Sequence, residues 1–567
     1  MRRLISLRTQ ESADRRLTVA LPILWAAFLT LLIAGPWLDG GYIFGTDWPG
    51  PRHFDFPQTV SSSAPFQTLL AGVSRILSGE LTGKLFVVAL LFVAALTAYR
   101  AMPIDAFVPK ATASIVYLFN PFVYGRLHYG QLFLLAGYAV LPLAALRLHR
   151  LLIEPRPATA FASAVSLVVL GIFSLHMFLV ASVLAGALLL TYAIAFRGRV
   201  AYLKRLALGL LLSAGVTFAA SSYWMIPVLI GLGPDARVVG ATGSGDLGAY
   251  ASIPDQHLGL LPNLLGLYGF WAENTGRFTS LKEFVPWWPA VLIVLLLVGA
   301  VGAIAVFRQR RDRLAPWVAG LLIVAVVALI LEAGISEPAT SGLVLWLDTN
   351  LPLYKGMRDA GKWAALLALV YSQLVGLGAA AILEWIRKQI HITARRDWVV
   401  AVATGLLLAV PLYYGNGLLY GMHGEIKTSQ YPPGWYAADQ VLAADSHPGQ
   451  TLFLPWHEYM ALSFVRNQNS VVASPAPSFF STPILVSADP EVPGIAPPAD
   501  SEQTAISDLV RAGSQGQWAQ VLAAHNVKYV LLAREVDWSS YVFLDNQPGL
   551  VRVGDYGSIV LYRNSLL

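Results

Sequence analysis

Long apolar runs alternate with short polar segments along most of the chain, and the runs have the length that crosses a bilayer. A transmembrane helix needs about 17 to 25 predominantly apolar residues. Such runs recur from Leu17 onward, each bounded by charged or turn-forming residues. They predict 11 transmembrane helices, at residues 17–38, 83–101, 108–124, 131–146, 158–174, 177–196, 206–231, 286–307, 315–335, 363–383 and 398–418.

Composition supports lipid as the solvent for these helices. Of the 567 residues 13% are charged and 56% hydrophobic, whereas soluble globular proteins carry about a quarter charged residues. The first run follows a cluster of arginines but is too long for a signal peptide and lacks a clear small-residue cleavage site. We therefore expect it to be a retained first span. The chain is predicted to be a polytopic α-helical membrane protein.

Basic residues separate the loops into two alternating sets, which predicts the orientation. Cytoplasmic loops of membrane proteins are enriched in Lys and Arg. The rich set comprises the N-terminal arginines and Arg100/Lys110, Arg147/Arg150/Arg156, Arg197/Arg199/Lys204/Arg205, Arg308/Arg310/Arg311/Arg313 and Arg387/Lys388/Arg395/Arg396. We expect the N-terminus inside and the C-terminus outside, in a plasma membrane.

Two helix assignments have alternatives. Residues 158–196 read as one kinked helix or as two helices split near His176, and residues 108–146 as two spans or a re-entrant hairpin. The split is favoured because a single helix would place the later basic loops outside. Eleven or nine spans both leave the C-terminus external.

The chain changes character after the last span. Residues 1–418 form the predicted membrane domain, and residues 419–567 a small external α/β domain. From Gly415 onward there are 7 Lys and Arg against 13 Asp and Glu, so the net charge of +6 reflects membrane topology and not nucleic-acid binding. The expected strands are 451–455, 470–473, 529–533 and 558–562, and the expected helices are 435–445, 502–512 and 517–525.

Three external loops are long, at residues 39–82, 232–285 and 336–362. Within the first, residues 66–77 have the apolar spacing of a helix lying in the membrane interface. The same loop carries two carboxylates, Asp47 and Asp55, with Trp48, Arg52 and His53. A carboxylate can take the proton of an attacking hydroxyl, aromatic rings stack on sugars, and cations hold phosphate. These residues are candidates for a sugar site, or for a plain interfacial turn.

Cations in two other external segments are candidates for holding a lipid phosphate. Arg126 and His128 lie in the turn 120–131, and Arg358 and Lys362 precede the tenth span. If that last segment is helical, the i, i+4 spacing puts both cations on one face. Ordinary interfacial snorkelling or headgroup pairing is the alternative for each.

In the external domain, Trp456, His457 and Glu458 follow a predicted strand and are candidates for substrate binding. The chain has no cysteine, which excludes disulfides, thiolate catalysis and cysteine-ligated metal sites. It also lacks the HExxH, GxSxG, P-loop and dinucleotide-binding patterns. No cofactor is predicted, and nothing in the residues supports a divalent metal.

The acidic first loop, the Asn-Pro-Phe-Val-Tyr…Gly-Gln turn at 120–131, the Arg-Asp-x-x-Lys cluster at 358–362 and the external α/β domain together resemble the GT-C membrane glycosyltransferases. The closest likeness is to the N-terminal membrane region of actinobacterial arabinofuranosyltransferases. The resemblance implies transfer of a sugar from a polyprenyl-phosphate donor to a glycan, lipid or protein acceptor of the cell envelope, by an inverting reaction. It also implies that Asp47 is the base. Asp47 and Asp55 stand eight apart with no Asp-x-Asp pair, a departure from many members that leaves metal dependence open.

Two other function classes stay open at this point. A transporter of a lipid-linked or envelope precursor would use the broken segment 108–146 and the hairpin near His176 to line a pathway, although no internal repeat is evident. A non-catalytic assembly scaffold would use the membrane part as an anchor, for which eleven spans are excessive.

Overall fold

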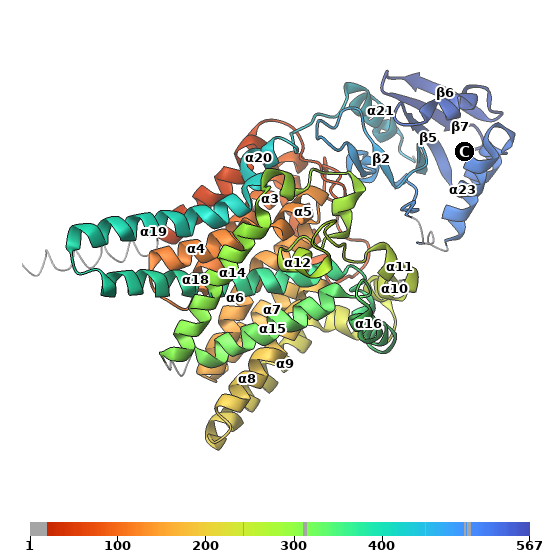
Figure 1. The fold of residues 1–567 in the computed structure, drawn as a ribbon. Helices are drawn as coiled ribbons and strands as arrows, with labels where there is room; N and C mark the ends of the chain where they lie inside the picture. Colours follow the sequence, from red (N-terminus) through yellow and green to blue (C-terminus); the bar gives the residue numbers. More distant parts are fainter. Residues whose placement is uncertain (1–19, 242, 310–313, 448, 493–494, 496–499) are drawn as a thin grey trace, which may run out of the picture.

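A bundle of long apolar helices makes up most of the molecule, and a small sheet region stands at one end of it (Figure 1). The structure is a computed structural model that describes residues 20–567 apart from 242, 310–313, 448, 493–494 and 496–499. The N-terminal arginines and Arg310, Arg311 and Arg313, used above for orientation, lie outside these residues. Within the described part, nine helices are long and apolar enough to cross a membrane.

These nine helices coincide with nine of the predicted spans. They are Ala20–Leu38, α3 (Gly79–Ala101), α6 (Leu132–Ile153), α8 (Leu175–Ala195), α9 (Val200–Leu229), α14 (Trp288–Arg308), α15 (Ala315–Ala333), the segment Ala360–Gln389 that contains α18 (Ala364–Gln389), and α19 (Thr393–Tyr414). The other two predicted spans correspond to the shorter apolar helices α4 (Phe107–Leu118) and α7 (Pro157–Phe173). The polytopic helical fold is confirmed.

The prediction of one continuous span over 108–124 is wrong. Helix α4 ends at Leu118, and a separate buried helix, α5 (Pro121–Tyr129), starts three residues later. Asn120 caps α5 by accepting a 3.0 Å hydrogen bond from the Val123 amide, and Pro121 has no N–H to continue α4. The predicted external turn at 120–131 is therefore mostly a helix.

The predicted split near His176 is confirmed. Helix α7 ends at Phe173 and α8 begins at Leu175, with Ser174 between them in extended conformation. The Ser174 hydroxyl accepts a 3.4 Å hydrogen bond from the Met177 amide and so starts the second helix.

Small residues bring the central helices together. Helix α18 is largely buried and packs on α14, where a Cβ on Gly378 would lie 1.9 Å from the carbonyl oxygen of Val298. Only glycine allows the two backbones to approach so closely, which is how helices associate where no hydrophobic effect drives them.

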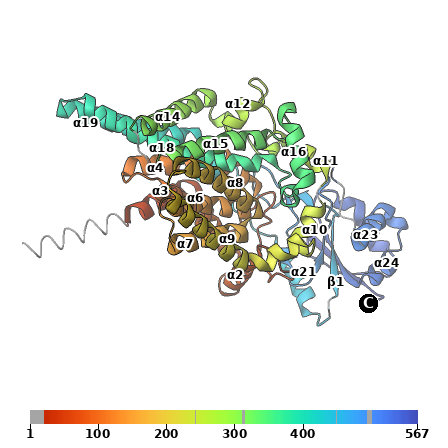
Figure 2. The same cartoon turned by 90° about the horizontal axis from the view of Figure 1, so that it is seen from below.

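Exposed tryptophans lie near both ends of the bundle. Trp287 precedes α14 and Trp346 lies on α16 (Pro338–Asn350), whereas Trp385 and Trp398 lie where α18 ends and α19 begins. Tryptophan favours the membrane–water interface, so these positions are those of two aromatic belts. The short helices α10 (Gly233–Ala241), α11 (Ser244–Ala249) and α16 lie at the end that carries the sheet region (Figures 1 and 2). The predicted interfacial helix of the first loop is α2 (Ala64–Ile76).

The C-terminal region is built on a mixed five-stranded sheet of order β4-β1-β5-β7-β6. The strands are β1 (Gln450–Leu454), β4 (Ile484–Leu485), β5 (Val527–Ala533), β6 (Leu550–Asp555) and β7 (Ile559–Asn564), with a separate hairpin of β2 (Tyr459–Ala461) and β3 (Val471–Ala473). Helices α21 (Pro433–Ala444), α23 (Ser501–Ala512) and α24 (Trp518–Ala524) accompany it. The predicted strands and helices are found within a few residues; β2, β4 and β6 were missed.

Alternation along the strands gives this sheet two apolar faces. Phe453 joins one core with Trp435 of α21, while Leu452 and Leu454 join another with Trp518 of α24. The first core also contains Tyr42 and Phe44, which belong to the long first loop, residues 39–82. The loop is therefore part of the core of the C-terminal region.

The absence of native cysteine makes the predicted orientation directly testable. We expect Ser514→Cys, exposed in the C-terminal region, to react with a membrane-impermeant maleimide on intact cells. Gly198→Cys, exposed between α8 and α9, is expected to react only after permeabilisation. The reverse pattern would contradict the orientation.

Candidate active site

A cavity of about 880 Å³ opens where the helix ends meet the C-terminal region. Its wall combines the long first loop, α2, the start of α6, the junction of α7 with α8 and the segment before α18. Six of the predicted site residues line it: Asp47, Trp48, His53, Asp55, Arg358 and Lys362.

Hydrogen bonds hold the Asp47 carboxylate from two sides. Oδ2 accepts from Gln131 Nε2 at 3.2 Å, and Oδ1 accepts from the Tyr459 hydroxyl at 3.1 Å. Burial raises the pKa of Asp47, while these two hydrogen bonds and the charge of Arg277 oppose the rise. The group is thus a carboxylate with raised basicity, as a general base requires.

The backbone around Asp47 is fixed against the end of α5. The Asp47 amide donates to the Tyr129 carbonyl at 2.7 Å. Gly130 has a φ of +82°, and a Cβ there would lie 2.9 Å from the Trp48 amide nitrogen. Gly45 lies against Gly130, since a Cβ on Gly45 would lie 2.8 Å from the Gly130 Cα. Two glycines therefore let the first loop lie directly on the end of α5.

Arg126 lies behind the cavity wall. Its side chain is 1% exposed, forms a two-point ion pair with Asp359, and stacks 4.0 Å from the centre of the Phe270 ring. Nη1 also donates to Gln131 Oε1 at 2.8 Å, which turns the Gln131 amide nitrogen toward Asp47. Arg126 thus orients Asp47 through Gln131, and its predicted donor-phosphate role stays a prediction without a place in the cavity wall.

Lys362 and Arg358 supply the positive charge of the cavity wall. The segment before α18 is not α-helical, so the predicted i, i+4 face is wrong: Arg358 lies in a loop and Lys362 in the 3₁₀ helix η3 (Ala360–Trp363). Arg358 pairs with Asp246 at 2.9 Å. Among the described side chains the Lys362 ammonium has no hydrogen-bond or ion-pair partner, although it is 8% exposed and near the Asp359 charge.

The remaining predicted residues of the first loop and turn have different surroundings. His53 Nε2 lies 3.3 Å from Asp55 Oδ2 at the exposed side of the cavity. Arg52 is outside the cavity wall and pairs with Asp439 of α21 at 2.6 Å, between the rings of Tyr436 and Phe479. His128 is buried with Nε2 2.9 Å from Glu425 Oε2. Arg52 and His128 thus connect the membrane part to the chain beyond α19.

The three candidates of the C-terminal region also differ from one another. Trp456 is buried and donates to Ser507 at 3.1 Å, while His457 lies 2.7 Å from Glu491. Glu458 is near the charge of Asp47; burial and that charge raise the pKa of Glu458 to about 7. None of the three lines the cavity.

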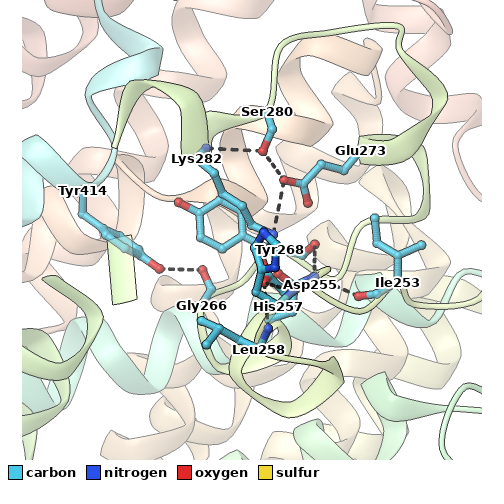
Figure 3. A network of polar contacts seen from close by, with 11 residues as sticks. Ile253, Asp255, His257, Leu258, Gly266, Tyr268, Glu273, Ser280, Lys282 and Tyr414 are labelled. Atoms are coloured by element: carbon cyan, nitrogen blue, oxygen red, sulfur yellow. Dashed lines mark hydrogen bonds and ion pairs between the residues drawn. The ribbon is translucent and has the colours of Figure 1, made fainter. Parts of the chain in front are cut away.

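The long loop before α14 brings a further cation to Asp47. Lys282 braces this loop by donating to Asp255 at 2.8 Å and to Asn263 at 2.7 Å, over the ring of Tyr268 (Figure 3). Arg277 of the same loop donates to the Tyr129 hydroxyl at 2.9 Å. The Lys282 ammonium is paired within this loop, so the network serves as a structural support.

Gln131, Tyr459 and Arg277 are the residues around Asp47 that sequence reasoning missed. Gln131 is the last residue of the turn 120–131 that had been singled out, and Tyr459 directly follows the candidates at 456–458. Arg277 had no local signal. Within the described residues no group of three or more His, Asp or Glu side chains has an arrangement that could hold a metal ion.

The chain matches no protein-family model and no curated protein. Among solved structures it is similar to the arabinofuranosyltransferase AftD from Mycobacteria, with a TM-score of 0.61 and 15% identity over 97% of this chain and 40% of that one. A substituted form of that enzyme gives a TM-score of 0.58 at 15% identity, and the match covers 97% of this chain and 41% of that one. The Archaeoglobus fulgidus oligosaccharyltransferase gives 0.45 at 13% identity, over 91% and 69%.

The expected likeness in fold to an arabinofuranosyltransferase is therefore confirmed. This chain spans about 40% of the length of the mycobacterial enzyme.

We expect Gly130→Ala to destabilise the protein by about 1–2 kcal/mol or more, because the left-handed backbone penalises a Cβ and Trp48 already occupies its place. The measurement is thermal unfolding of the purified protein in detergent. Gly72→Ala is the matched control, since its Cβ meets open space within α2 and should be neutral or slightly stabilising. Equal melting temperatures for the two variants would contradict the packing described.

Proposed function

We propose that this protein is a membrane glycosyltransferase that moves a sugar from a polyprenyl-phosphate donor to a hydroxyl of a glycan, lipid or protein acceptor at the external face. The observation that carries the proposal is one cavity that contains a positioned carboxylate, Asp47, and the buried cation Lys362, whose ammonium has no hydrogen-bond or ion-pair partner among the described side chains. A buried cation without a partner is costly, and an anionic ligand would relieve that cost.

The proposed reaction is a single displacement. Asp47 accepts the proton of the acceptor hydroxyl as its oxygen attacks the anomeric carbon. The bond between that carbon and the phosphate oxygen breaks, and the phosphate leaves with the electron pair. Lys362 and Arg358 balance the negative charge that develops on it. Attack opposite the leaving group inverts the anomeric centre.

The apolar part of the cavity wall supports a lipid as the carrier of the donor phosphate. Beside Asp47 the wall continues onto apolar side chains of helices α6, α7, α8 and α9, namely Leu132, Phe133, Phe173, Leu175, Phe178, Leu179 and Trp224. Such a surface fits an isoprenoid chain better than a nucleotide, which has a polar base and ribose. The fold shared with a mycobacterial arabinofuranosyltransferase supports the same class of reaction.

We expect Asp47→Asn to lower kcat by about 10²- to 10⁴-fold, the usual contribution of a general base. The assay follows transfer from radiolabelled polyprenyl-phosphate sugars by the full chain in nanodiscs. Asp508→Asn, which removes a carboxylate from an exposed pair with Arg511, is the control. Full activity of Asp47→Asn at matched folding would rule out this residue as the base.

We expect Lys362→Met to reduce kcat/KM for the donor by about 10- to 100-fold, which corresponds to the loss of one charge-assisted hydrogen bond of ~1.5–3 kcal/mol. Binding of the donor lipid, measured without acceptor, should weaken in parallel. Lys427→Met removes an exposed lysine and should leave both quantities unchanged. Unaltered donor binding in Lys362→Met would contradict the phosphate assignment.

A further inference from the structure

The C-terminal region contributes one side chain directly to Asp47. Tyr459 begins β2, and its hydroxyl donates to Asp47 Oδ1 at 3.1 Å across 412 positions of sequence. The ring also lies 5.9 Å from the guanidinium of Arg277, the cation nearest to the same carboxylate on the loop before α14. Tyr459 is half-buried there.

The position of this hydroxyl is set by backbone pairing. Tyr459 pairs with Ala473 in the β2–β3 hairpin, and the Ala473 amide donates to the Thr46 carbonyl at 2.7 Å. Thr46 immediately precedes Asp47. The hairpin is therefore hydrogen-bonded to the backbone of the first loop one residue before Asp47. This bond fixes the position of the Tyr459 ring relative to the carboxylate.

We infer that Tyr459 is a positioning residue for Asp47, so that the C-terminal region is a part of the catalytic centre and not a separate binding module. The inference rests on the role of Asp47 in the proposed function. Gln131 and Tyr459 each donate to a different carboxylate oxygen, which fixes the plane of the group. Each oxygen keeps a second lone pair, and one of these is free for the acceptor hydroxyl.

Removal of the Tyr459 hydroxyl has a predictable effect on pH dependence. Its hydrogen bond favours the ionised form of Asp47, so its loss raises the pKa of that carboxyl. A base works only when ionised, so activity is present above its pKa and lost as the pH falls through it. Without the Tyr459 hydroxyl, the acid limb of the pH–activity profile should therefore move to higher pH. The other charged or titratable groups facing Asp47 are Arg126, Arg277, Lys362, Glu458, Tyr129 and Tyr250.

The test compares Tyr459→Phe with Tyr529→Phe in the full chain in nanodiscs. Tyr529 makes the same kind of bond, to Asp445 at 2.8 Å, at a place remote from the cavity. One readout is the acid limb of kcat/KM for transfer. The other is the protonation midpoint of Asp47, followed by its carboxyl stretch in difference infrared spectra against Asp47→Asn.

We expect both midpoints to rise by about one pH unit in Tyr459→Phe and to stay unchanged in Tyr529→Phe. A difluorotyrosine introduced at position 459 is a stronger donor and should move them the opposite way, which keeps the test valid if the phenylalanine variant folds poorly. An infrared midpoint that does not move in either Tyr459 variant overturns the inference. Absence of transfer by the wild type, with the infrared shift present, overturns the proposed function alone.

Discussion

The backbone of residues 42–53 is held from both sides, and the arrangement of the cavity depends on this. On one side the Asp47 amide bonds to the end of α5. On the other, Thr46 and Arg52 bond to the C-terminal region, and Phe44 is buried in its core. A loop would ordinarily be among the more mobile parts of a protein. Here it is a layer between two packed bodies, which keeps Asp47 in one position.

In the membrane part, a buried ion pair also helps to hold Asp47 in position. Arg126 is paired with Asp359, and the same guanidinium orients Gln131, which in turn donates to Asp47. Buried ion pairs add little net stability, but removing one partner destabilises the protein by about 3–5 kcal/mol. Such a pair holds geometry firmly. The carboxylate, its two donors and Lys362 are thus placed by α5, the segment before α18, the start of α6 and β2 together.

The candidate site was partly predictable for reasons that particular residues make clear. Asp47 was found as a carboxylate among aromatic and cationic residues, and Arg358 and Lys362 as neighbouring cations before a span; all three line the cavity. Arg126 was also a candidate cation, but it forms a buried ion pair with Asp359. A cation that becomes buried needs an anion nearby, but the sequence does not say which anion. Whether that anion is a ligand or a side chain 233 positions away is decided by packing.

By itself the sequence determined the class of fold, the places of the apolar helices and most elements of the C-terminal region, because bilayer thickness and side-chain periodicity are local constraints. Asn120 and Pro121 were also a local signal for the break in the third apolar run, at residues 108–124, which was predicted to be a continuous span. Only the tertiary structure decided that Tyr42 and Phe44 belong to a distant core and that Tyr459 reaches Asp47. These contacts join segments about 400 residues apart, and such pairings follow from three-dimensional packing that no local pattern records.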